Sequence, residues 1–179
     1  MTNTAGTRSG ITGHPQPRTR GHLTAVFAAL SIASAWLGAT PSTWVRHDLG
    51  AFWMQAPPTW TYSKGQGTDS AVGRLDSAGV SMDFDFGMYS DPLRIPAGAT
   101  DVKEHALKVD GLPARQVSYI MHAAATTPVH YLGLHVPQVR TTSMGKQKLT
   151  LLAQSAEALP LKKAAAVMAT IRVKPAPRH

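Results

Sequence analysis

Two aspartates lie two positions apart in a stretch where polar and apolar side chains alternate. Asp83 and Asp85 occupy polar positions of the segment from Val80 to Tyr89. In an extended strand such residues point to the same face and lie about 6.5–7 Å apart. Two carboxylates near this spacing can act as acid and base in glycoside hydrolysis. Charges are also common on the solvent face of an antiparallel sheet, so the pattern indicates either a hydrolase site or a solvated face.

Three further residues extend this candidate site. Asp69 and Ser70 precede the pair, and Tyr89 follows it. The oxygens of Asp69 and Ser70, with those of the aspartate pair, could hold a cation. Aspartate followed by serine is also typical of a turn or cap. We therefore predict all five residues as binding residues. We assign no catalytic residue, because the chain lacks the Gly-x-Ser-x-Gly elbow of serine hydrolases.

Aromatic and imidazole side chains offer two other kinds of site. Tyr89 could belong to a platform for a carbohydrate or a peptide, whereas Trp60, after a proline pair, is expected in the core. His122 and His130 flank a short loop, and two facing imidazoles could bind zinc or copper. No third ligand is evident, so these histidines remain the only metal candidates, and we predict no metal site and no cofactor.

A β-hairpin must position the aspartates. Residues 71–75 and 80–89 flank the turn segment Asp76-Ser-Ala-Gly79. One face of the second strand is apolar and should cover a core; its members are Val80, Met82, Phe84, Phe86 and Met88. If the turn centres on Ser77 and Ala78, Leu75 opposes Val80 and Ser70 opposes Asp85. Arg74 is then diagonal to Asp83, within reach of an ion pair.

The rest of the chain predicts more strands and one helix. The expected extended segments are 51–54, 59–62, 105–109, 112–121, 129–136 and 147–153. Asp110-Gly111 is a strong signal for a two-residue hairpin turn. Beyond Ser155 the period becomes helical, with an apolar face of Leu161, Ala164, Ala165, Met168 and Ile171. We therefore predict an α+β fold, an antiparallel sheet of hairpins with a C-terminal helix packed on it.

The first 39 residues are typical of an export segment. Residues 1–22 contain three arginines and no acidic residue, and residues 23–39 carry no charge. Basic, then apolar, then small residues is the layout of a signal peptide, and we favour cleavage after Ala39. An uncleaved signal anchor and a buried core helix are the alternatives, although 17 uncharged residues that include Thr24, Ser31 and Ser34 are short for a membrane span. The predicted organisation is a signal peptide at 1–39, a linker at 40–49, one domain at 50–173 and a frayed tail at 174–179.

Composition excludes several classes of function. The chain has 179 residues, no cysteine and a net charge of +8. Without cysteine there is no disulfide, no thiolate nucleophile and no lipid-anchored cysteine. Removing residues 1–39 leaves 15 basic and 10 acidic residues, a charge of about +5 that is dispersed along the chain. Nucleic-acid binding needs a basic face with interleaved aromatics, so we do not predict it.

Five motifs occur in an order that resembles a known group of proteins. They are Pro58-Thr-Trp60, Gly67-Thr-Asp-Ser-Ala-Val-Gly73, Met82-Asp-Phe-Asp-Phe-Gly-Met-Tyr-Ser90, Asp110-Gly-Leu-Pro-Ala114 and Thr170-Ile171. Together they resemble small exported bacterial proteins that are similar to the PsbP-like α/β/α sandwich. The resemblance covers roughly residues 50–173. The resemblance implies a PsbP-like α/β/α sandwich and a secreted or periplasmic location. It does not identify a catalytic residue.

These observations favour an exported, non-enzymatic accessory or binding protein of the bacterial cell envelope. Its partner would be an envelope protein or a small ligand. Membrane attachment is expected only if residues 23–39 are not cleaved. The alternative function is a small hydrolase that uses Asp83 and Asp85. These alternatives make different demands on the site, because a hydrolase needs both carboxylates available in a concave pocket.

Overall fold

The computed structural model describes residues 43–122 and 127–175, which form ten strands and one helix. The elements are β1 (Val45–Asp48), β2 (Phe52–Ala56), β3 (Thr61–Lys64), β4 (Ser70–Ser77), β5 (Val80–Gly87), β6 (Thr100–Val109), β7 (Leu112–Met121), β8 (Val129–Thr142), β9 (Gly145–Ser155), α1 (Ala158–Met168) and β10 (Arg172–Val173). The expectations for residues 1–42 and 176–179 lie outside the described residues.

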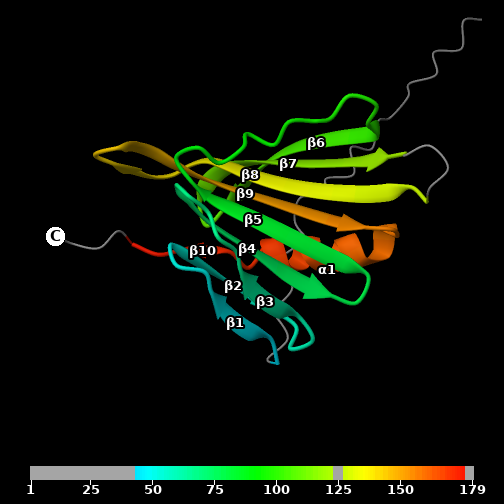
Figure 1. Cartoon of the computed structure of the whole chain (residues 1–179), viewed down its shortest axis with the longest axis horizontal. Helices are drawn as coiled ribbons and strands as arrows, with labels where there is room; N and C mark the ends of the chain where they lie inside the picture. The colour runs from blue at the N-terminus through cyan, green and yellow to red at the C-terminus, as the bar shows by residue number, and fades with distance from the viewer. Residues whose placement is uncertain (1–42, 123–126, 176–179) are drawn as a thin grey trace, which may run out of the picture. The chain divides into compact units, whose positions relative to one another are not determined.

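Seven strands form one antiparallel sheet in the order β3-β4-β5-β9-β8-β7-β6 (Figure 1). Three two-strand hairpins, β4–β5, β6–β7 and β8–β9, build most of it from local pairings. The β9 strand inserts between β5 and β8, so the hairpin containing the aspartates joins the C-terminal half of the sheet. This places Asp85 directly opposite Thr150, 65 positions along the sequence but adjacent in space.

A second, three-stranded sheet has the order β1-β2-β10. Its two outer strands both run antiparallel to β2, and β10 comes from the end of the described chain. The Thr170 hydroxyl accepts the Gln55 backbone N–H at 2.7 Å and lies 2.7 Å from the Val167 carbonyl oxygen. This hydroxyl therefore joins the end of α1 to the middle of β2.

The main core lies between one face of the large sheet and the layer formed by α1 and β2. The apolar face predicted for β5 is buried, and Phe52 and Met54 of β2 are fully enclosed with it. Phe52 meets the ring of Phe84 edge to face, with 5.4 Å between centroids. Burial of aromatic rings in such pairs supplies a large share of core stability.

The helix α1 begins just after Ser155, whose hydroxyl accepts the Glu157 N–H at 3.0 Å. Its buried residues are Leu161, Ala164, Val167 and Met168. They contact β8, β9, β5 and β2, which explains why a short helix without acidic residues in its first turn is stable here. No helix within the described part of the chain is long and apolar enough to cross a membrane.

The opposite face of the large sheet, which we call the outer face, is covered by the β5–β6 loop, residues 88–99. Leu93 in this loop is buried with Val117 and Tyr119 in a small second cluster. A Cβ added to Gly133 would come within 2.5 Å of the Leu93 side chain. The absence of a side chain at Gly133 therefore leaves room for Leu93 to pack against β8. Leu93 adopts φ of 61°, a conformation that is rare for a bulky residue.

The α+β class, with a C-terminal helix packed on an antiparallel sheet, is confirmed, as is the burial of Trp60. Three finer expectations are corrected. Segment 40–49, expected as a linker, contains β1, which pairs with β2. The strand expected at 105–109 begins at Thr100. Lys174, expected in a frayed tail, donates its backbone N–H to Ala51 and its ammonium group contacts Asp48. The finer α/β/α layering stays a prediction; in the described residues a loop covers the outer face of the sheet.

Candidate functional site

The β4–β5 hairpin brings Arg74 and Asp83 directly opposite each other rather than diagonally. The turn consists of Ala78 and Gly79, one residue later than expected, and Gly79 has a positive φ of 77°, which glycine adopts without steric cost. The Arg74 guanidinium donates from Nε and Nη2 to the two carboxylate oxygens of Asp83, at 2.6 and 2.9 Å. The predicted ion pair is confirmed, and in this register Ser70 opposes Gly87 rather than Asp85.

Asp85 has a different environment from Asp83. It is partly buried, and its Oδ1 atom has no hydrogen-bond partner among the described residues and no exposure to water. On the strands beside it, Asp85 lies opposite Val72 and Thr150, neither of which is charged. One aspartate of the pair is therefore neutralised by an arginine, and the other is not.

A cavity of about 1050 Å³ lies at the end of the large sheet where β3 and β4 are joined. We call it the hairpin cavity. It is lined by three segments, residues 64–72, residues 86–89 and the β8–β9 hairpin around Met144. Three of the predicted binding residues, Asp69, Ser70 and Tyr89, line it together.

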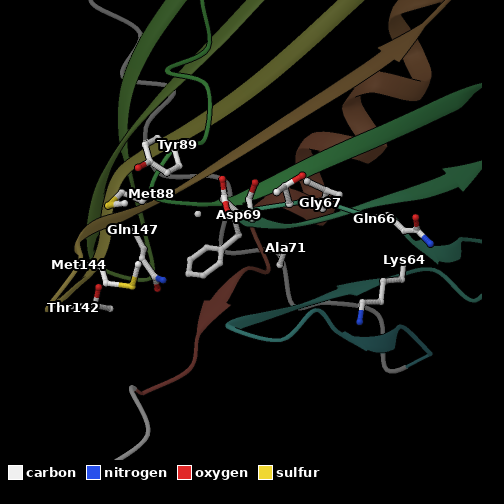
Figure 2. A pocket seen from close by; sticks show the side chains of 16 residues that line it. Lys64, Gln66, Gly67, Asp69, Ala71, Met88, Tyr89, Thr142, Met144 and Gln147 are labelled. Atoms are coloured by element: carbon white, nitrogen blue, oxygen red, sulfur yellow. The ribbon is translucent and has the colours of Figure 1, made fainter.

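Figure 2 shows how these side chains are arranged. Met144 and Gln147 of the β8–β9 hairpin lie at one end of the cavity and Lys64 and Gln66 at the other, with Asp69 between them. Tyr89 and Met144 are 71% and 79% exposed, so both present apolar surface at the rim. The lining thus combines hydroxyl, amide and carboxylate groups with an apolar rim.

A second cavity, of about 760 Å³, lies on the outer face of the large sheet. We call it the carboxylate cavity, because Asp83, Asp85 and Asp91 all line it. Its apolar walls come from Leu93, Pro96, Tyr119 and Leu152. The two cavities adjoin, since Lys64, Gly65 and Val72 line both of them. The five predicted binding residues are therefore divided between two neighbouring cavities.

A buried hydroxyl cluster, not identified from the sequence, holds the β5–β6 loop against the outer face. The Ser90 hydroxyl donates to Thr150 Oγ1 at 2.8 Å and lies 3.0 Å from the Asp85 carbonyl oxygen. Thr150 Oγ1 donates to the Asp91 carbonyl oxygen and lies 2.9 Å from His135 Nδ1. Because the single Thr150 proton is used on Asp91, His135 must carry its proton on Nδ1 to complete the contact.

The surroundings of His135 explain why its pKa is lowered. The side chain is buried, and burial together with the nearby charges of Arg115 and Lys148 lowers its pKa, while Asp91 acts in the opposite direction. Arg115 also donates to the carbonyl oxygens of Pro92 and Leu93 and pairs with Glu104. The loop that lines the carboxylate cavity is therefore fixed by polar contacts at both Asp91 and Leu93.

The two histidines considered for metal binding lie at the far end of β7 and β8. Ile120, rather than His122, opposes His130, so the two imidazoles are diagonal neighbours. Within residues 43–122 and 127–175, no group of three or more His, Cys, Asp or Glu side chains is arranged to hold a metal ion.

Comparison with known proteins adds little to this geometry. No protein-family profile matches the chain, and no curated protein matches it either. Among solved structures, a crystal structure from Bacteroides thetaiotaomicron is similar with a TM-score of 0.46 and 12% identity. The similarity covers 70% of this chain and 46% of that one, so the chain spans about half the length of that protein. At this level the similarity supports no argument about function.

Proposed function

We propose that this protein is a non-enzymatic binding protein that holds a polar ligand in the hairpin cavity. The observation that carries the proposal is the convergence of Asp69, Ser70 and Tyr89, from segments on either side of a hairpin, on one cavity with an exposed apolar rim. Ligand sites are concave and combine apolar surface with a few convergent polar groups. A large, exposed aromatic ring beside such a cavity is a surface that a ligand would cover.

The lining favours a ligand with hydroxyl and amide groups and one apolar face. Gln66 and Gln147 present amides, and Asp69 presents a carboxylate, so the cavity can both donate and accept hydrogen bonds. The Tyr89 ring and the Met144 side chain provide apolar contact at the rim. An amino sugar oligomer has this combination of groups, and we expect the ligand to be a glycan of the cell envelope.

The experiment is a calorimetric or NMR titration of the protein with the tetramer of N-acetylglucosamine. The wild type should bind, and Tyr89→Ala should weaken binding about three- to tenfold. An aromatic contact contributes about 0.5–1.5 kcal/mol, and each 1.4 kcal/mol corresponds to a factor of ten. Binding should depend on Asp69 in the same experiment, with Asp69→Ala also weaker than wild type.

The matched control is Leu159→Ala, which removes another exposed large side chain, 64% exposed on α1 and outside both cavities. It should bind the tetramer as the wild type does. Equal binding by the wild type and Tyr89→Ala would show that the hairpin cavity is not the site. Absence of binding by the wild type would exclude amino sugars as the ligand class.

The hydrolase alternative is less consistent with the site. A carboxyl group that serves as acid or base must be free to contact the substrate, whereas both carboxylate oxygens of Asp83 accept hydrogen bonds from the Arg74 guanidinium. That leaves only one of the two carboxylates available. We therefore retain the binding function as the proposal.

The proposed location and the proposed family relationship rest on the sequence alone. The basic and apolar order of residues 1–39 supports export to the periplasm or the medium, and the five ordered motifs support a relationship to PsbP-like envelope proteins. An envelope protein remains the alternative partner, and attachment to the membrane would follow only from retention of residues 23–39.

A further inference from the structure

We propose that the carboxylate cavity is a second binding site, which takes the ammonium group of a small organic amine with an apolar body. The site is distinct from the hairpin cavity and does not depend on the ligand proposed there. The argument rests on the charge balance of the cavity, on the burial of one carboxylate oxygen and on the apolar walls.

Three acidic and three basic residues line the cavity, and their charges are unequally satisfied. Lys64 and Arg94 are exposed, whereas Asp85 is partly buried. Asp83 is paired with Arg74 through two hydrogen bonds. Asp91 Oδ1 accepts the backbone N–H groups of Leu93 and Arg94, at 2.7 and 3.3 Å. Hydrogen bonds of this kind stabilise a carboxylate. Asp85 is the remaining acidic residue of the lining, and its Oδ1 has no partner among the described residues.

An unpartnered buried carboxylate oxygen is unfavourable. Removing a polar group from water without a hydrogen bond costs about 1–3 kcal/mol, and more when the group is charged. Only the Oδ1 atom of Asp85 is enclosed, and the residue lines an open cavity, so a cation in the cavity would face the same carboxylate and compensate its charge. An ammonium group supplies both the positive charge and up to three hydrogen-bond donors.

The surroundings of Asp85 favour an organic amine over a metal ion. Calcium takes six to eight oxygen ligands and magnesium six in strict octahedral geometry, whereas no suitable cluster of three acidic or histidine side chains exists in the described part of the chain. The cavity is instead walled by Leu93, Leu152 and the Tyr119 ring. These surfaces suit the hydrocarbon part of a ligand whose charged end reaches Asp85.

The cavity is also held open by a fixed loop. Arg115 binds the carbonyl oxygens of Pro92 and Leu93, and Thr150 binds that of Asp91. Leu93, in its rare φ of 61°, contacts Gly133 at the floor. A preformed wall lowers the entropic cost of ligand binding.

The test uses two probes of nearly equal shape, benzylamine and benzyl alcohol, titrated into the full-length protein and followed by NMR. The wild type should bind benzylamine at least tenfold more tightly than benzyl alcohol. Asp85→Asn, which keeps the shape and removes the charge, should abolish this preference. Asp76→Asn is the matched control, since Asp76 projects from the neighbouring strand on the same face but lines neither cavity.

Four results would overturn the proposal: equal binding of the two probes by the wild type, no binding of either probe, a preference that survives in Asp85→Asn, or a preference that Asp76→Asn removes. The comparison of the two probes on the wild type needs no variant and stands even if Asp85→Asn fails to fold. Tyr89→Ala should bind benzylamine as the wild type does, because Tyr89 lines only the hairpin cavity. A negative result for one cavity therefore does not affect the test of the other cavity.

Discussion

At the scale of single residues, the outer face of the large sheet depends on a few buried polar side chains. Ser90, His135 and Thr150 are each less than a tenth exposed, and together they fix the loop that lines the carboxylate cavity. Buried polar groups are stabilising only when each is hydrogen-bonded. His135 carries a proton on Nδ1 in this cluster, so a second proton on Nε2 would place a positive charge in a buried site. Burial and the charges of Arg115 and Lys148 oppose that charge and lower the pKa of His135.

We predict that the protein loses stability as the pH falls below about 6.5, the pKa of an unfolded histidine. Burial, first, and the charges of Arg115 and Lys148 lower the pKa of His135 in the folded state. Between the two pKa values the unfolded chain binds more protons than the folded one, so the free energy of unfolding decreases as the pH falls. The contribution is fully present above the unfolded pKa and is lost as the pH falls through the folded pKa.

Urea unfolding at pH 7.5 and at pH 5.5 measures this effect. His135→Gln should reduce the difference in unfolding free energy between the two pH values, whereas His105→Gln, at an exposed position of β6, should not. Some difference should remain in His135→Gln, because burial also lowers the pKa of His47. An unchanged pH difference in His135→Gln would contradict the assignment.

At the scale of elements, α1 and β2 together form the layer that closes the main core. The sequence predicts that α1 alone covers the apolar face of β5, but the fully buried Phe52 and Met54 of β2 share this role. The helix remains a large contributor, because one stripe of its surface is enclosed while Leu159 on the opposite side is 64% exposed. The two sides of α1 should therefore respond differently to truncation.

Met168→Ala should lower the free energy of unfolding by about 2–5 kcal/mol, because it leaves a cavity at a position only 1% exposed. Leu159→Ala should change it by less than about 0.5 kcal/mol. Alanine favours the helix in both variants, so helix propensity does not separate them. Chemical unfolding of both variants provides the measurement, and similar losses in the two would show that α1 does not pack as described.

The elements that could be predicted are those with a local periodic signal. The alternation of Val80 to Phe86 and the Asp110-Gly111 turn identify their hairpins, because one buried face imposes a period of two. The first seven residues of β6 are all exposed and carry no such pattern, so its start is missed. β1 is missed for the same reason, since Val45 and Arg46 are both exposed.

The candidate site could be predicted only in part. Five binding residues were identified from their types, and they line the two cavities, but their division between them depends on hairpin register. A shift of the turn by one residue pairs Arg74 with Asp83 directly. Thr150 reaches the site through the long-range pairing of β9 with β5, and His135 and Met144 come with it as parts of the β8–β9 hairpin. The local sequence has no signal for the pairing of β9 with β5.

At the scale of the whole molecule, we expect the mature protein to be shorter than the full sequence. We predict that the protein recovered from a periplasmic or culture fraction of an expressing bacterium begins at residue 40, because small residues precede that position and a proline follows it. The net charge would then decrease from +8 to about +5.

Intact-mass spectrometry of that fraction shows at which residue the recovered protein begins. A mass corresponding to residues 40–179 supports export with cleavage. A full-length mass found only in the membrane fraction would contradict cleavage and indicate a signal anchor. Replacing Ala39 by a bulky residue should slow processing, which distinguishes specific cleavage from later trimming.

The pairing of β10 with β2 has a consequence for the order of folding. Thr170 and Gln55 are 115 positions apart, and β2 gains its second neighbouring strand only from Arg172 and Val173. Contacts of such long sequence separation form late, because closing the loop is entropically costly until other contacts shorten it. A chain that enters a translocation channel by its N-terminus therefore cannot complete the small sheet until its last residues have emerged. If the protein is exported as we propose, the small sheet would therefore stay incomplete until β10 has left the channel.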